Sequence, residues 1–178
     1  MFVALALPEP VRAALAALTE PLSGVTWTPA AQLHLTLRFL GDVADERLEA
    51  VTQHLAAVRV EPFILPVEGV GSFPPNAAPR VVWVGIGRGH PRLHQLRQRV
   101  DDALLAAGLL DLAMHLFHPH VTLGRCRENA PAEVSHWIRA HLEFAAPPFR
   151  MDAFDLMASR LQPIGAVHTL VEQFALAK

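Results

Sequence analysis

The stretch that decides the fold runs from residue 33 to residue 40 and reads LHLTLRFL. Apolar and polar residues alternate in it, which is the period of a β-strand. Side chains at positions i and i+2 of a strand share a face, so we expect His34, Thr36 and Arg38 on one face. The leucines and Phe39 would lie on the other. The strand thus has an apolar face for a core and a polar face that carries a histidine and a threonine.

The His-x-Thr pattern occurs a second time, with His120 standing 86 positions after His34. Residues 120–125 read HVTLGR, and the same alternation places His120 and Thr122 on one face. Arg125 would face away in a regular strand, but twist or a β-bulge near the strand end would turn it toward them. Given ten histidines in the chain, about 0.4 chance occurrences of His-x-Thr are expected. Two occurrences, each followed by leucine, are therefore informative.

The rest of the chain alternates between helical and strand patterns. We expect helices over 9–19, 44–58, 91–107 and 131–142, the third of them ended by Gly108. We expect further strands over 2–7, 25–28, 63–73, 81–86, 151–158 and 167–176, with a kink at Pro66 or Gly69. This mixed order, with a His-x-Thr strand and a following helix occurring twice, predicts an α+β fold. We expect one bilobal, pseudo-symmetric domain over residues 1–178, with two antiparallel sheets flanked by helices around a central cleft.

Composition argues against several classes of protein. The net charge is −2, so the chain lacks the positive charge needed to bind along a nucleic-acid backbone. No apolar run approaches the roughly 20 residues of a membrane span. Pro8 and Pro10 interrupt the apolar N-terminus, which favours a first strand over a signal peptide. We expect a cytoplasmic monomer with no membrane partner.

Cys126 is the only cysteine, so the chain has no disulfide framework, and a reducing cytoplasm fits. We interpret Cys126 as a small residue at a strand end. The alternative is a nucleophile activated by its neighbours Arg125 and Arg127.

The residue types in the two motifs suit the cleavage of a phosphodiester. In-line displacement at phosphorus needs a base on the attacking oxygen and an acid on the leaving oxygen, and histidine can serve as either near neutral pH. The threonine hydroxyls can donate to the non-bridging oxygens, which gain charge in the transition state. Two facing His-x-Thr strands would supply these groups without a metal or a cofactor. The alternative is two half-buried histidines that only hydrogen-bond to their neighbours in a sheet.

The two motifs resemble those of the two-histidine phosphoesterases. Residues 34–41 (HLTLRFLG) and 117–125 (FHPHVTLGR) are most similar to the paired motifs of the RNA 2′,3′-cyclic phosphodiesterases, also called 2′-5′ RNA ligases. The resemblance covers nearly the whole chain. Residues 2–8 resemble the first strand of that family, residues 69–74 and 79–85 its middle hairpin, and residues 159–161 its late turn.

The resemblance implies roles that the two strands by themselves do not distinguish. His34 would be the proton donor and His120 the proton acceptor, while Thr36, Thr122 and Arg125 would bind the phosphate. The chain would then be an RNA 2′,3′-cyclic 3′-phosphodiesterase, a metal-independent hydrolase that leaves a 2′-phosphomonoester. Its partners would be RNA ends with a 2′,3′-cyclic phosphate, including transfer-RNA fragments, or small cyclic nucleotides.

Two residues depart from the family pattern, and two other functions stay open. Gly124 stands where the family more often has Ala or Leu, and His168 stands where it often has Tyr. A 2′-5′ RNA ligase would run the reverse chemistry at the same site. A non-catalytic module would bind RNA ends without turnover, although such a module has no need for a matched acid and base.

Other histidines and aromatic residues permit alternative sites. His115, His118 and His120 have spacings found in zinc-binding runs, but no cysteine or carboxylate stands at ligand spacing beside them. We interpret the i, i+4 pair His90 and His94 as a solvated helix face rather than as two metal ligands. Phe39 and Phe73 could stack on a base, and the alternative for each is the core.

Charged residues could complete the site. A carboxylate could orient a catalytic histidine, and arginines could form a basic rim or simply be solvated. The carboxylate candidates are Glu68, Asp101, Asp102 and Asp155, and the rim candidates are Arg80, Arg127, Arg150 and Arg160.

Overall fold

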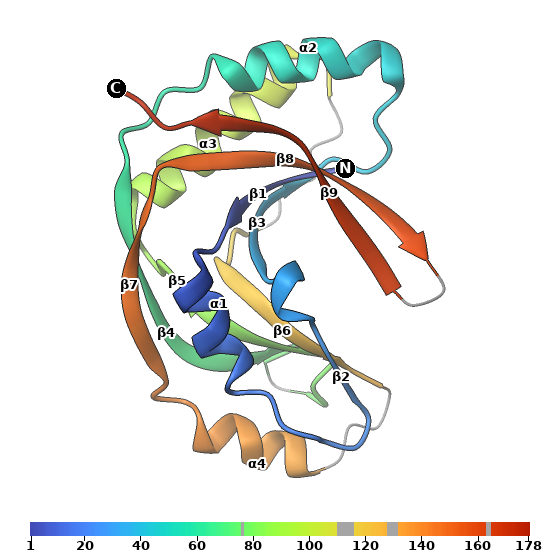
Figure 1. Ribbon diagram of the computed structural model, residues 1–178, viewed down its shortest axis with the longest axis vertical. Helices are drawn as coiled ribbons and strands as arrows, with labels where there is room; N and C mark the ends of the chain where they lie inside the picture. The colour runs from blue at the N-terminus through green and yellow to red at the C-terminus, as the bar shows by residue number, and fades with distance from the viewer. Residues whose placement is uncertain (76, 110–115, 128–131, 163–164) are drawn as a thin grey trace.

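The computed structural model describes residues 1–75, 77–109, 116–127, 132–162 and 165–178. Helices α2 and α3 lie together at one end of the molecule and α4 lies at the other (Figure 1). The helices are α1 (Glu9–Ala16), α2 (Asp45–Ala56), α3 (Pro91–Ala106) and α4 (Ala132–Ala140), with a 3-10 helix η1 (Ala30–Gln32). The strands are β1 (Phe2–Ala6), β2 (Val25–Trp27), β3 (His34–Phe39), β4 (Phe63–Phe73), β5 (Val81–Ile86), β6 (His120–Cys126), β7 (Ala145–Met151), β8 (Ala153–Gln162) and β9 (Gly165–Ala175). All four predicted helices are present.

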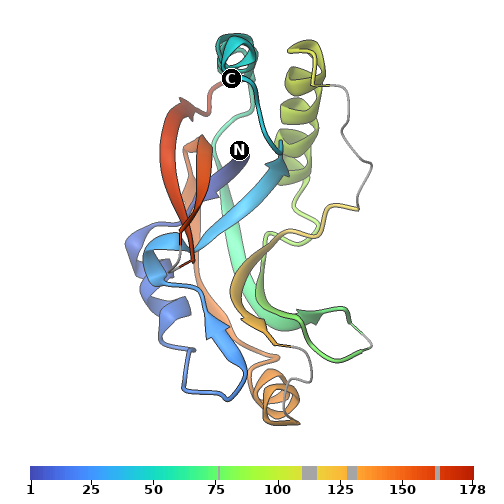
Figure 2. The same ribbon diagram turned by 90° about the vertical axis from the view of Figure 1, so that its right-hand side faces the viewer.

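The nine strands of the described residues form one antiparallel path rather than two separate sheets. Their order is β7-β4-β5-β6-β3-β1-β8-β9, and β2 pairs with β6. We expected two sheets, but Leu35 of β3 pairs with Val121 of β6 and joins the halves β7-β4-β5-β6 and β3-β1-β8-β9. Strands β8 and β9 lie on one side of this junction, and β5 and β6 lie on the other (Figure 2). The predicted α+β class and the antiparallel arrangement are confirmed.

A shared core lies between the sheet and the helices α2 and α3. Leu35 and Val121 are fully buried in it, and Leu55 of α2 and Leu96 of α3 join the same cluster. Burying a side chain of this size contributes about 1.5–3 kcal/mol to folding. The core therefore stabilises the junction that brings the two His-x-Thr strands together. Among the described residues, none of the helices has both the length and the apolar content needed to cross a membrane.

Strand β3 carries a β-bulge directly after its threonine. Ala4 of β1 pairs with Thr36, and the next residue back, Val3, pairs with Arg38, so Leu37 is an extra residue. An extra residue shifts the alternation of side chains by one position. The side chains beyond Leu37 therefore change face.

The bulge reverses two predicted orientations. Arg38 does not share the face of His34: it is buried, and its Nε lies 3.1 Å from Oδ1 of Asp101 on α3. Phe39 does not join the core, since it is 70% exposed. The expectation from strict alternation was wrong for both residues, because alternation continues only while each residue has one partner.

Strand β4 has a register irregularity at both of the positions predicted for its kink. One shift lies across Pro66 in the pairing with β7, and another lies across Gly69 in the pairing with β5. Proline has no N–H to donate to the ladder, and Gly69 has a φ of 74°, which a residue with a Cβ rarely adopts. The predicted end of the third helix is also confirmed, because Gly108 follows α3 with a φ of 83° and its N–H donates to the carbonyl of Leu105.

Candidate active site

The pair between Leu35 and Val121 sets the two motifs side by side. In an antiparallel ladder the residues flanking a pair face each other across the strands, so His34 lies beside Thr122 and Thr36 beside His120. These four side chains share the face opposite Leu35 and Val121, and all four are half-buried. The structure thus brings together the two histidines and two threonines that the sequence singled out.

Each of the two rings is held by the same kind of hydrogen bond. Nδ1 of His34 lies 2.7 Å from the carbonyl oxygen of Gln32, and Nδ1 of His120 lies 2.7 Å from that of His118. A carbonyl oxygen can only accept, so Nδ1 is the donor in both rings. Nε2 is then the nitrogen of each ring that is left to gain or lose a proton.

The orienting partner is therefore a backbone carbonyl two residues earlier and not a carboxylate. Asp101 pairs with Arg38 and Arg97. Asp155 accepts a hydrogen bond of 2.9 Å from the side chain of Gln173. Among the described residues, neither His34 nor His120 has a carboxylate hydrogen-bonded to its ring. These carbonyl partners could not be predicted from the sequence, because every residue has a backbone carbonyl and no residue type marks the position.

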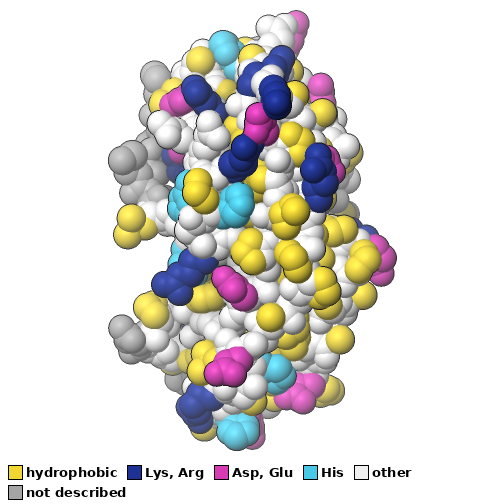
Figure 3. Space-filling model, turned by 90° about the vertical axis from the view of Figure 1, so that its left-hand side faces the viewer, with side chains coloured by type: hydrophobic (Ala, Val, Ile, Leu, Met, Phe, Trp, Pro, Cys, Tyr) yellow, Lys and Arg dark blue, Asp and Glu magenta, His cyan; other side chains and the backbone are white. Residues whose placement is uncertain are grey.

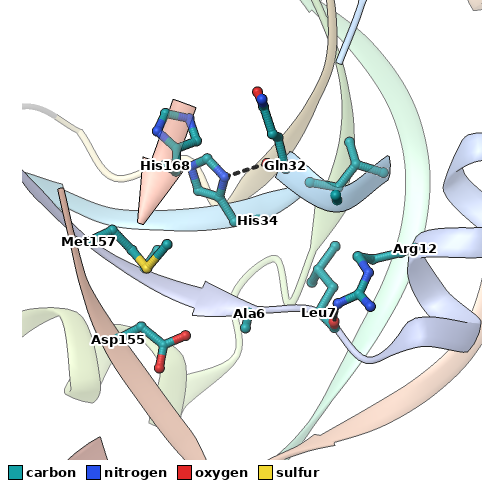
Figure 4. Close-up of a pocket in the computed structure, with 11 residues that line it drawn as sticks. Ala6, Leu7, Arg12, Gln32, His34, Asp155, Met157 and His168 are labelled. Carbon is teal, nitrogen blue, oxygen red and sulfur yellow. Dashed lines mark hydrogen bonds between the residues drawn. The ribbon is translucent and has the colours of Figure 1, made fainter. Parts of the chain in front are cut away.

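The ring of His34 lies between two other rings. Phe2 stacks on it with the ring centroids 4.9 Å apart, and the ring of His168 approaches it at 5.3 Å with the planes nearly perpendicular. In Figure 4, His34 and His168 point toward each other from β3 and β9. A pocket of about 110 Å³ opens beside them, and its lining includes Arg12 and Asp155.

The ring of His120 has a different, aromatic surrounding. Phe73 meets it edge to face at 5.0 Å, Trp83 lies at 6.3 Å and His118 at 6.0 Å between ring centroids. The two histidines therefore occupy equivalent strand positions in unlike environments. The sequence analysis had named Phe73 as a residue that could stack on a base. The contacts of Phe2 and His168 with His34 could not be predicted, because they depend on pairing between distant segments of the chain.

Burial lowers the pKa of both histidines below the ordinary value. For His34 the hydrogen bond to Gln32 opposes this effect, and repulsion from His168 and His120 adds to it. For His120 the hydrogen bond to His118 again opposes burial, and the charge of Arg125 lowers the pKa further. In the protein without substrate, both rings are therefore mainly neutral at pH 7.

Arg125 reaches the same face through the bulge that the sequence suggested. Trp83 of β5 pairs with Thr122, and the preceding Val82 pairs with Gly124, so Leu123 is an extra residue in β6. Beyond it Arg125 pairs with Val81, which shares a face of β5 with Trp83. Arg125 thus returns to the face of Thr122, with its side chain exposed.

The predicted basic rim consists of exposed arginines, one of which is engaged elsewhere. Arg80, Arg127, Arg150 and Arg160 are all exposed. Nε of Arg150 lies 2.7 Å from Oδ1 of Asp152 in an exposed ion pair. On the face drawn in Figure 3, Lys and Arg side chains are mixed with acidic and apolar ones and form no continuous basic stripe. That mixture agrees with the net charge of −2.

The alternative sites receive little support from the described residues. Burial raises the pKa of the Cys126 thiol, which disfavours the thiolate that a nucleophile requires. His90 stacks on Phe63 at 5.3 Å between ring centroids and is half-buried, so it is not a simple solvated residue. His115 lies outside the described residues. Within them, no group of three or more His, Cys, Asp or Glu is placed to hold a metal ion.

Known proteins resemble this chain over most of its length. The model of the 2′-5′ RNA ligase superfamily matches residues 7–162. A curated RNA 2′,3′-cyclic phosphodiesterase of Archaeoglobus fulgidus is 32% identical over 171 residues, which cover 94% of this chain and 95% of that protein. One of Thermus thermophilus is 35% identical over 185 residues, covering 99% and 89%.

Solved structures agree with these relatives. A crystal structure of a Thermus thermophilus protein has a TM-score of 0.81 at 30% identity, covering 98% of this chain and 96% of that one. The apo crystal structure of E. coli LigT has a TM-score of 0.80 at 26% identity, covering 99% and 96%. The predicted family is thereby confirmed, and the chain belongs to the 2′-5′ RNA ligase superfamily.

Proposed function

We propose that this chain is an enzyme that hydrolyses the terminal 2′,3′-cyclic phosphodiester of RNA to a 2′-phosphomonoester without a metal. The observation that carries the proposal is the pair between Leu35 and Val121, which sets His34 and His120 on one face, each with Nδ1 bonded to a carbonyl. The relatives from Archaeoglobus fulgidus and Thermus thermophilus are named RNA 2′,3′-cyclic phosphodiesterases, which supports it.

The two histidines take opposite parts in one displacement at phosphorus. Nε2 of His120 takes a proton from a water molecule as the water oxygen forms its bond to phosphorus. The bond between phosphorus and the 3′ oxygen breaks, and Nε2 of His34 gives its proton to that oxygen. The products are a 2′-phosphomonoester and a 3′-hydroxyl, and exchange with solvent returns both histidines to their starting forms.

The protonation states needed for this step follow from the site and the substrate together. Burial keeps His120 neutral at pH 7, as a base requires. His34 must be protonated, and burial opposes this. A bound phosphodiester carries a negative charge, which raises the pKa of a nearby imidazole. Substrate binding therefore charges the acid, and we expect a bell-shaped dependence of the rate on pH.

The remaining site residues stabilise the developing charge. Thr36 and Thr122 place their hydroxyls beside the two histidines, where they donate to non-bridging oxygens. The guanidinium of Arg125, on the same face beyond Thr122, binds the phosphate through charge and two parallel donors. We further propose that residues 1–178 act as one bilobal domain and as a monomer.

The experiment that tests this function is product analysis on a short oligoribonucleotide that ends in a 2′,3′-cyclic phosphate. We expect a 2′-phosphomonoester and no 3′-phosphomonoester. A product with a 3′-phosphate would contradict the proposed leaving group. Addition of EDTA should leave the rate unchanged, whereas strong inhibition that is reversed by a divalent metal would contradict the metal-independent chemistry.

A ligase activity is the second candidate, because the family description names it. The 5′-hydroxyl of another RNA would replace water as the nucleophile, and the same two proton transfers would form a 2′-5′ bond. Incubation of cyclic-phosphate and 5′-hydroxyl RNA halves together, with measurement of joined and hydrolysed product, decides whether water or the 5′-hydroxyl is the dominant nucleophile. Tight binding of RNA ends with neither product would instead indicate a binding module.

A further inference from the structure

The two carbonyl groups that orient the histidine rings are themselves held in different ways. Gln32, whose carbonyl accepts from His34, ends the 3-10 helix η1, which is closed by backbone hydrogen bonds. His118, whose carbonyl accepts from His120, precedes β6 in a segment of which the described residues, 116–119, belong to no helix or strand. The position of the His118 carbonyl therefore depends on side-chain contacts more than that of Gln32 does.

Helix α3 contacts Phe117, the residue just before His118, through two of its side chains. The guanidinium carbon of Arg97 lies 5.6 Å from the centroid of the Phe117 ring, within the range of a cation–π contact. The ring of His94 meets Phe117 edge to face at 5.5 Å between ring centroids. His94 and Arg97 stand three residues apart, so they lie on one face of the helix. These contacts anchor the backbone at residues 117 and 118 to α3.

The same face of α3 also contacts the strand of the first motif. Asp101 stands four residues after Arg97, and its carboxylate pairs with Arg97 and with Arg38 of β3. Arg97 is 8% exposed and Arg38 is 9% exposed, so two buried cations share this carboxylate. Burial and the charge of Arg38 lower the pKa of Arg97 to about 10, so it remains a cation at pH 7. A buried cation keeps its partners because losing them is costly, and Arg97 is thereby fixed in place.

We propose that Arg97 and Phe117 position His120: together they hold the carbonyl of His118 where it keeps Nδ1 of His120 as the donor. Both are positioning residues, because they act through the backbone of His118 and not on the substrate. The inference rests on the proposed function, in which Nε2 of His120 must be free to take a proton from water. Because Asp101 ties Arg97 to β3 as well, α3 relates the base on β6 to the strand of the acid.

The test removes each contact while leaving Asp101 in place. Arg97→Met keeps an apolar stem and leaves Asp101 paired with Arg38, so no carboxylate is stranded. Phe117→Leu keeps an apolar side chain but has no aromatic face. In both variants we expect kcat on the cyclic-phosphate oligoribonucleotide to fall roughly 10- to 100-fold, with KM within about threefold of wild type. Phe117→Tyr keeps the ring and should keep the rate. Arg99→Met, at an exposed position of the same helix, is the matched control.

Imidazole ¹⁵N NMR gives a readout that a loss of stability alone would not change. At about pH 8, where both rings are neutral, the wild type should carry the proton on Nδ1 of His34 and of His120. In Arg97→Met and Phe117→Leu we expect His120 to become a mixture of the Nδ1 and Nε2 tautomers. The signals of His34 should not change, because its carbonyl partner belongs to η1. Arg99→Met should give wild-type signals for both rings.

Two results would overturn the inference. One is a His120 tautomer that stays unchanged in both Arg97→Met and Phe117→Leu. The other is an equal change at His34 and His120, which would indicate a general loosening of the fold rather than an effect on one carbonyl. Urea denaturation of each variant, by comparison with wild type, establishes that the folded state is the one observed.

The tautomer measurement also keeps this inference distinct from the proposed function. It requires neither substrate nor turnover, so a wild type that cleaves nothing would contradict the proposed function alone. The role of Arg97 and Phe117 would then still be decided by the signals of His120. A fall in kcat without any change in those signals would leave the function standing and would contradict the positioning.

Discussion

Leu35 of β3 pairs with Val121 of β6, and both side chains are fully buried. Among the described residues this is the only pair between the two strands, so it alone sets the register of the two His-x-Thr motifs. A shift of one residue would turn one motif toward the core and separate its histidine from the other. The chemistry proposed for the site thus depends on two side chains that have no chemical role themselves.

Truncation at this junction should destabilise the protein strongly. Leu35→Ala removes buried methyl groups and leaves a cavity between the halves, so we expect the free energy of unfolding to fall by about 2–5 kcal/mol. Urea denaturation followed by tryptophan fluorescence measures it. Leu105→Ala, at an exposed position of α3, is the matched control and should change stability by about 0.5 kcal/mol or less. Equal effects of the two substitutions would contradict the role of the junction.

The threonine hydroxyls should matter for the rate and little for the fold. Valine has the shape of threonine without the hydroxyl, so Thr36→Val and Thr122→Val each remove one donor to the phosphate. We expect kcat to fall by about 10²- to 10³-fold in each, the usual effect of losing one such donor. Thr169→Val, at an exposed position of β9, is the control. Losses smaller than about threefold at both motif positions would argue against phosphate binding by the hydroxyls.

Stability should decline as the pH falls below neutrality. Burial lowers the pKa of five histidines in the folded state: His34, His90, His118, His120 and His168. The unfolded chain, with ordinary values near 6.5, then binds more protons than the folded one as the pH falls below that value. Their contribution is fully present above about pH 6.5 and is lost as the pH falls through the lowered folded values.

Denaturation at about pH 8 and about pH 5.5 measures this effect. Burial raises the pKa of Asp155, which acts in the opposite sense, because a raised value favours the folded state as the pH falls. This compensation acts as the pH falls toward the ordinary value near 3.8, so Asp155→Asn should lose stability more steeply than the wild type when the series is extended to that pH. Stability that is unchanged between the two pH values would contradict the burial of these histidines.

Much of this site could be predicted because it is local in sequence. Alternation placed His34 with Thr36 and His120 with Thr122, and the chance of a bulge near Arg125 could be stated in advance. The orientations of Arg38 and Phe39 could not be predicted. The bulge that sets them is an extra residue in β3, and a residue is extra only relative to the partner strand β1. The same kind of bulge thus confirmed one expectation and overturned two others.

Other features depend on pairing that the sequence does not display. The strand expected in this region began only at residue 151, yet β7 covers Ala145–Met151 and includes two prolines, at 147 and 148. Strand β7 is an edge strand of the sheet, so one side of it has no neighbouring strand to which the missing proline N–H would donate. His168 reaches His34 through the chain of pairs β3-β1-β8-β9. In the sequence, His168 was noted only because the family that the chain resembles often has tyrosine at this position.

The central claim, that His34 and His120 act on one phosphorus, is tested most directly by the rates of three variants. These are His34→Gln, His120→Gln and the double variant, with an oligoribonucleotide that ends in a 2′,3′-cyclic phosphate as substrate. We expect each single variant to lose about 10²- to 10⁴-fold in kcat. The double variant should be little slower than either, because two groups that act as a unit are not additive. His54→Gln, at an exposed position of α2, should keep the wild-type rate. Retention of most of the wild-type rate by either single variant would contradict the account.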